Sequence, residues 1–175
     1  MRKHNFFPGP ATLPFEVIQE AAAGLVDYNG MGVSIAEISH RSPIFTDLLD
    51  EANALVKKLY DLSNDWAVLW LPGGASSQLT VAPMNLTEPN DKIAFVDTGF
   101  WAGRAIEAAA NEANAFFLAS SKDTNYDRIP KITDVQGARY LHVVSNETID
   151  GTQYQEFPEV DVPLVADMTS DFLSR

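Results

Sequence analysis

Five short segments of the sequence carry side chains that could bind a small molecule. They are residues 71–78 (LPGGASSQ), 96–101 (VDTGFW), 145–151 (SNETIDG), Asp167 in the run PLVAD, and residues 38–41 (ISHR). None is a P-loop or a dinucleotide fingerprint, because the glycines of 71–78 are not followed by Gly-Lys-Ser/Thr and no GxGxxG is present. The chemistry must therefore be read from each segment.

The segment 71–78 favours an anion. Its glycine pair lets the backbone approach a ligand, and serines at the start of a helix add donors to the free N–H groups there. An ordinary tight turn with a serine cap is the equal alternative.

Two side chains at strand ends are suited to a flat heteroaromatic ring. Trp101 could stack on such a ring, or it could pack between helix and sheet. Asp167 ends an apolar strand, so its carboxylate needs a partner to offset desolvation. That partner could be a protonated ring nitrogen, a helix N-terminus or a cation. The segment 145–151 is either a plain turn or a set of polar groups facing the same crevice.

Arg41 has the planar donor fork that binds carboxylates and phosphates, although an exposed surface arginine is the simpler interpretation. His4 is expected at a solvated terminus and His142 as a packed strand residue. Three scattered histidines do not indicate a metal site.

The elements that position these groups follow from the hydrophobic pattern. An irregular arm (5–14) precedes a helix at 15–28 that Asn29-Gly30 ends, and a second helix at 42–62 has Ser42 as N-cap and Pro43 at its first position. Short apolar strands are predicted at 66–71, 92–97, 115–118, 140–144 and 163–167, with helices at 76–86 and 101–111. This alternation indicates a parallel α/β sheet, whose ligands bind at the carboxyl ends of the strands.

Composition narrows the class of protein. The 175 residues are 46% hydrophobic, enough for one globular domain. A net charge of -12 without a basic cluster argues against nucleic acid, and the lack of cysteine excludes disulfides and thiolate sites. No apolar run approaches the roughly 20 residues of a membrane span, and no signal peptide is evident. We expect a soluble, cytoplasmic protein.

Taken together and in this order, the segments resemble the phosphoserine aminotransferase family of pyridoxal-phosphate enzymes. The most specific strings are Ser39-His40-Arg41 and residues 146–151 (NETIDG). The resemblance implies a three-layer α/β/α fold with a mostly parallel sheet, the large domain of the fold type I transferases. It covers the first half of a family member, so residues 1–14 would be an N-terminal arm and 15–175 an incomplete large domain.

The resemblance also implies roles for single residues. Ala75 and Ser76 would bind the phosphate of pyridoxal 5'-phosphate, Trp101 would stack on its ring, Thr148 would hydrogen-bond it, and Asp167 would pair with its ring nitrogen. His40 and Arg41 would bind the substrate. Some relatives have arginine at Ser76 and serine or alanine at Pro8, so phosphate binding here would rest more on the backbone.

The implied reaction is amino transfer between L-glutamate and 3-phosphohydroxypyruvate, giving phosphoserine for serine biosynthesis. The family's Schiff-base lysine would lie beyond Arg175, so the chain alone is expected to be inactive. It would pair as a homodimer or with a C-terminal half.

Two alternatives remain. Another enzyme of the same fold, an alanine–glyoxylate-type transaminase or a cysteine desulfurase, is disfavoured by His40-Arg41 and by residues 146–151. A truncated, non-catalytic interaction piece would need a partner to cover its open sheet edge.

Overall fold

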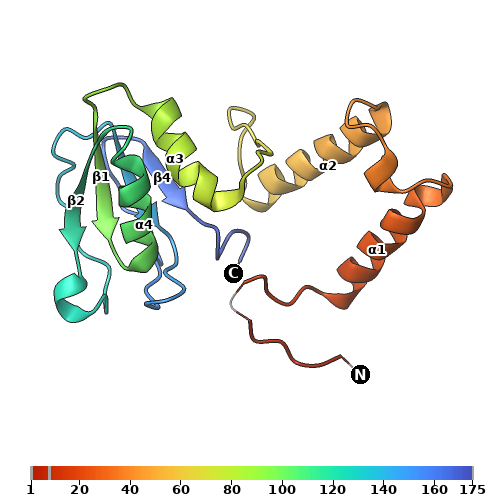
Figure 1. Cartoon of the computed structure of the whole chain (residues 1–175), viewed down its shortest axis with the longest axis horizontal. Coiled ribbons are helices and arrows are strands. Elements are labelled where there is room, and N and C mark those ends of the chain that lie inside the picture. Colours follow the sequence, from red (N-terminus) through yellow and green to blue (C-terminus); the bar gives the residue numbers. More distant parts are fainter. Residues whose placement is uncertain (1, 8, 175) are drawn as a thin grey trace. The chain divides into compact units, whose positions relative to one another are not determined.

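A computed structural model describes residues 2–7 and 9–174 of the chain. The chain divides into two compact units, Met1–Trp70 and Leu71–Arg175. Figure 1 labels most of their helices and strands. The predicted division into a short arm and one incomplete domain remains a prediction.

The first unit consists of two helices joined by single 3-10 turns at Tyr28–Gly30 and Ile35–Glu37. Helix α1 spans Phe15–Val26, and left-handed backbone at Asn29 and Gly30 follows it. Helix α2 spans Pro43–Leu59, with the Ser42 Oγ accepting a 3.2 Å hydrogen bond from the N–H of Phe45. The predicted cap of the second helix is therefore confirmed.

Neither helix of this unit buries a side chain within the described residues. The exposed apolar side chains include Phe15, Val17, Ile18, Leu25 and Val26 of α1 and Leu55 and Leu59 of α2. An apolar stripe of this kind is normally covered by another element.

The predicted strand at residues 66–71 is wrong. This segment has no strand structure, and Trp66, Leu69, Trp70 and Leu71 are between 57% and 72% exposed. A strand needs a hydrogen-bonded neighbour, and the described residues offer none to this run. The side chain of Trp70 is instead tied to α2, because its Nε1 donates to Oδ1 of Asn53 at 2.7 Å.

The second unit is built on a parallel sheet, as predicted. Its strands are β1 (Lys92–Asp97), β2 (Asn114–Ser120), β3 (Tyr140–Val144) and β4 (Leu164–Asp167), in the order β2-β1-β3-β4. All three pairings are parallel. The predicted α/β fold with a mostly parallel sheet is confirmed, and four of the five predicted strands are present in the described residues.

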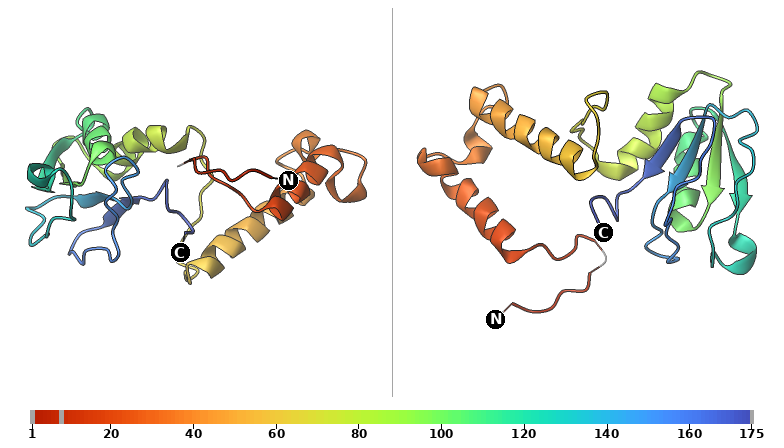
Figure 2. Two further views of the ribbon diagram at one scale, coloured as in Figure 1. Left: turned by 90° about the horizontal axis from the view of Figure 1, so that it is seen from below. Right: turned by 180° about the vertical axis from the view of Figure 1, so that it is seen from behind.

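Helices cover one face of this sheet. Helices α3 (Gly74–Leu86) and α4 (Phe100–Ala109) place Leu79, Ala105 and Ala109 against Ile93, Phe95 and Tyr140 of the strands. Burying a large apolar side chain contributes about 1.5–3 kcal/mol. The views of Figure 2 show both helices beside the sheet.

Loop segments cover the opposite face. Alternate strand residues point there, among them Ala94, Val96, Leu141 and Val143, and they pack against Ile129, Ile132, Tyr154, Val160 and Val162 of the connecting segments. The sheet is therefore a two-sided core that fixes the strand ends. No helix in the described part of the chain is both long and apolar enough to cross a membrane.

Candidate functional site

Three polar segments meet at the carboxyl edge of the sheet. One follows β1, one follows β3, and the third is Asp167 at the end of β4. Since β3 lies between β1 and β4, the three strand ends are adjacent. The parallel order thus brings together residues that are up to 70 positions apart in the sequence.

Trp101 and Thr148 contact each other directly at this edge. The indole Nε1 of Trp101 donates a 3.0 Å hydrogen bond to Oγ1 of Thr148. The ring of Phe100 packs edge-on against the same indole, with centroids 5.1 Å apart and planes at 87°. The Trp101 side chain is half-buried, so part of it is open to a ligand.

Two carboxylates of the segment 145–151 cap the N-terminus of α4. Glu147 is completely buried, and its two oxygens accept 2.9 Å bonds from the N–H groups of Trp101 and Ala102. Oδ2 of Asp150 accepts a 2.7 Å bond from the N–H of Phe100. Burial raises the pKa of Glu147, and the two N–H donors oppose this effect. The first turn of α4 therefore has its free donors filled.

The backbone of this capping segment is itself held in place. The N–H of Glu147 donates to the carbonyl of Thr152 at 2.8 Å, and the N–H of Tyr154 donates to that of Ser145 at 2.9 Å. Oγ1 of Thr152 donates to the carbonyl of Thr98 at 2.9 Å, which links the segment to the end of β1. The loop is thus a fixed part of the site.

Asp167 lies on the same face of the sheet as α4. Val165, two residues earlier, packs in the cluster formed with α4, and side chains alternate along a strand. Oδ1 of Asp167 accepts a 3.0 Å bond from the N–H of Thr169 and a second bond from the Thr169 hydroxyl. The carboxylate therefore accepts local hydrogen bonds of the kind that an N-cap residue makes, which is one of the alternatives that the sequence left open. It lies at the same edge of the sheet as Trp101.

His142 is packed, as the sequence suggested. It is buried on β3, and its ring lies 4.8 Å from that of Phe95. Its Nδ1 has no hydrogen-bond partner among the residues that the structure describes. Burial lowers the pKa of His142 to about 4, although the negative charge of Asp167 acts in the opposite direction.

The start of α3 is open. Its N-cap is Gly73, with φ 95°, and no side chain of the described residues caps the helix, so the serine cap that the sequence left open as an alternative is not formed. Ser77 instead donates from Oγ to the carbonyl of Gly73 at 2.9 Å. Ala75 is half-buried and Ser76 is exposed. The positive end of the helix dipole is therefore available to an anion.

His40 and Arg41 belong to the first unit. Both are exposed in the turn before α2, where the N–H of Arg41 donates to Oγ of Ser39 at 3.2 Å. The structure leaves their predicted role in substrate binding as a prediction.

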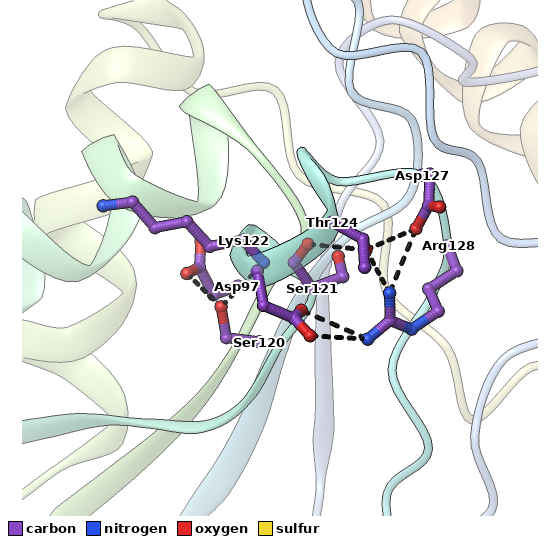
Figure 3. A network of polar contacts seen from close by, with 8 residues as sticks. Asp97, Ser120, Ser121, Lys122, Thr124, Asp127 and Arg128 are labelled. Carbon is purple, nitrogen blue, oxygen red and sulfur yellow. Dashed lines mark hydrogen bonds and ion pairs between the residues drawn. The ribbon is translucent and has the colours of Figure 1, made fainter.

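The sequence reasoning gave no role to Glu147, and none to Asp97. Oδ2 of Asp97 accepts a 2.6 Å bond from Oγ of Ser120, the bond drawn in Figure 3. Burial, followed by the neighbouring Asp97, raises the pKa of Tyr126. Both acids follow or end an apolar strand, which is the signal that singled out Asp167.

The same figure shows how the loop after β2 is held. Arg128 forms ion pairs with Asp123 and Asp127, both at 3.1 Å. These pairs are exposed, so we expect them to order the loop more than to stabilise the fold.

The fold and site define a class of protein. Parallel α/β proteins with polar groups at the carboxyl ends of their strands and an open helix N-terminus bind small anionic ligands there. The chain belongs to the class-V aminotransferase family, whose profile matches residues 4–175.

Its relatives narrow the family further. The chain is 45% identical over 177 residues to the phosphoserine aminotransferase of Flavobacterium psychrophilum. This match covers 100% of the chain and 50% of the relative. The solved phosphoserine aminotransferase from Bacillus circulans subsp. alkalophilus superposes with a TM-score of 0.92 at 41% identity, covering 97% of this chain and 48% of that one. The pyridoxal-phosphate-bound enzyme of Trichomonas vaginalis gives 0.88 at 29% identity, with 98% and 52% coverage. The chain thus spans about half the length of the relatives it matches.

Proposed function

We propose that the chain is the N-terminal part of a phosphoserine aminotransferase. The reaction would transfer an amino group between L-glutamate and 3-phosphohydroxypyruvate, in serine biosynthesis. The observation that carries the proposal is that the Trp101–Thr148 pair and Asp167 share one edge and one face of the sheet, in a chain whose relatives bear that name at about 45% identity.

The residues present fit pyridoxal 5'-phosphate. Helices α3 and α4 both pack on the sheet face that carries Asp167. The donors of α4 are taken by Glu147 and Asp150, whereas α3 has no side-chain cap among the described residues. A phosphate would therefore bind at α3, where Ala75 and Ser76 offer N–H groups and Ser76 adds a hydroxyl. When bound, the ring would act as the electron sink for amino transfer.

The other side chains would orient that ring. The exposed part of the Trp101 indole offers a flat surface for stacking. Thr148 would offer its hydroxyl to the cofactor. Asp167 would hold a proton on the ring nitrogen by its charge, with Thr169 fixing the position of its Oδ1. His40 and Arg41 would bind the phosphate end and the carboxylate of the substrate.

The uncovered apolar surface supports an assembly. The stripes of α1 and α2 and the run 66–71 are exposed, and large apolar patches usually mark interfaces. We propose that a C-terminal half of the kind found in the relatives covers part of this surface, and that a second subunit of a homodimer covers the rest. That half would also supply the lysine that binds the cofactor covalently. A cytoplasmic location stays a prediction.

The test is a reconstitution. The chain would be co-expressed with the C-terminal half of the Flavobacterium psychrophilum relative and assayed with 2-oxoglutarate, using phosphoserine or alanine as amino donor. We expect turnover with phosphoserine and none from either half alone. A preference for alanine would favour an alanine–glyoxylate-type enzyme, and turnover by the 175-residue chain alone would refute the assignment of the lysine to the other half.

A further inference from the structure

We propose that Glu147 is a positioning residue for the ring-stacking indole. Its buried carboxylate holds the start of α4 so that Trp101 and Thr148 keep their hydrogen bond and present a fixed surface to the cofactor. This inference deepens the function proposed above and depends on it for the identity of the ligand.

Glu147 is connected to both Trp101 and Thr148. One oxygen accepts from the N–H of Trp101 and the other from that of Ala102, both at 2.9 Å. Thr148, the next residue after Glu147, accepts the indole N–H of Trp101 at 3.0 Å. Glu147 is thus linked to Trp101 by a hydrogen bond and to Thr148 by a peptide bond. The three residues close a ring of contacts around the indole.

The hydrogen-bond donors around residue 147 require a carboxylate there. Two neighbouring N–H donors need two acceptors, and at the positive end of a helix a negative charge is favourable. Glu147 meets both needs while it is completely buried. Glutamine has the same shape but only one oxygen, and its NH2 group would face an N–H donor. An unpartnered buried donor is costly, so the first turn of α4 is expected to shift.

Asp150 does not duplicate this role. Asp150 accepts from the N–H of Phe100 at 2.7 Å, and its side chain is exposed at the surface end of the segment. Asparagine at this position keeps an acceptor oxygen and can reach water. Of the two acids, only Glu147 contacts the backbone of Trp101 itself.

The experiment uses the 175-residue chain labelled with nitrogen-15. The indole N–H signal of Trp101 in the nitrogen-15 NMR spectrum is assigned by its loss in Trp101→Phe. The Thr148→Val variant gives the chemical shift of the same indole N–H when it has lost its hydrogen-bond acceptor. We expect Glu147→Gln to move the indole signal toward the Thr148→Val position. It should also weaken the binding of pyridoxal phosphate, measured by equilibrium dialysis, by about tenfold or more.

The matched control is Glu107→Gln. Glu107 lies on the same helix but is exposed, in a surface pair with Arg104, so the same substitution should leave both the indole signal and the affinity unchanged. If Glu147→Gln lowers stability while the indole signal and the affinity stay at their original values, Glu147 is only a cap and the proposal is wrong.

Two further outcomes are decided separately. If Glu147→Gln does not fold, hydrogen exchange measured on the original chain tests the proposal. The proposal requires the indole N–H and the backbone N–H of Trp101 to exchange together. An indole N–H that exchanges far earlier than the backbone N–H overturns it. If the original chain binds no pyridoxal phosphate, the proposed function loses its cofactor, whereas a shifted indole signal in Glu147→Gln would still support the positioning role.

Discussion

Gly99 and Asp150 approach so closely that residue 99 has no room for a side chain. A Cβ atom there would lie 2.9 Å from Cγ of Asp150 and 2.9 Å from Cδ of Glu147, and nearer still to a carboxylate oxygen of Asp150. The backbone of Gly99 also has φ +154°. The glycine therefore allows both carboxylates to reach the start of α4.

Gly99→Ala should consequently destabilise the unit formed by residues 71–175. Overpacking of this kind costs about 1–3 kcal/mol, which urea unfolding followed by circular dichroism would detect. Gly103→Ala is the control on the same helix, because a Cβ there meets nothing within 4 Å. It should stabilise the helix by about 0.5–1 kcal/mol. Equal effects of the two substitutions would contradict the close packing described here.

Ser76→Arg should strengthen the binding of pyridoxal phosphate. Ser76 is exposed at the open start of α3, so an added guanidinium could reach the phosphate without desolvation. A charge-assisted hydrogen bond there should raise the affinity about tenfold. Equilibrium dialysis against pyridoxal, which lacks the phosphate, is the control and should show no gain. A gain for both ligands would mean that the phosphate does not bind at α3.

The sequence predicted the second unit well because its signals are local. Short apolar runs separated by helical periodicity define β1 to β4 with errors of a few residues at their ends, and parallel order then places the strand ends together. Ser42 and Pro43 likewise define the start of α2. The placement of Trp101, Thr148 and Asp167 at one edge of the sheet followed from this topology.

Other features depended on distant parts of the chain. The run 66–71 has the composition of a buried strand, yet no described strand pairs with it. The role of Glu147 depends on which N–H groups at the start of α4 lie opposite its carboxylate. A single sequence does not show how these two segments align. The sequence left open whether a serine caps α3, and the structure shows that the backbone of Gly73 with φ 95° forms the start of the helix instead.

Trp66 and Trp70 should be open to solvent in the chain alone. They are 59% and 57% exposed, so iodide should quench their fluorescence efficiently. Co-expression with the C-terminal half of a relative should reduce this quenching if that half covers the run 66–71. Trp66→Phe and Trp70→Phe assign the signals. Unchanged quenching in an assembled, active complex would show that this run is not covered by the other half.

His142 should make the second unit sensitive to acid. Its pKa is lowered to about 4 by burial, whereas a histidine in the unfolded chain has a pKa near 6.5. As the pH falls from about 6.5 to about 4, the unfolded chain therefore takes up a proton that the folded chain does not, and stability is lost across this window. The loss should be on the order of 3 kcal/mol in total. Burial raises the pKa of Glu147, so that group acts in the opposite direction.

His142→Leu isolates the contribution of the histidine, because the effects of Glu147 and the other groups cancel when the two chains are compared at each pH. Leucine fits the apolar surroundings beside Phe95 and removes the unpartnered Nδ1. Near pH 7 the variant should be at least as stable as the original chain, and its advantage should grow as the pH falls toward 4. The same substitution at exposed His4 controls for the loss of a histidine. Parallel stability curves for the original chain and His142→Leu between pH 7 and pH 4 would mean that the His142 ring takes up its proton while the sheet is still folded.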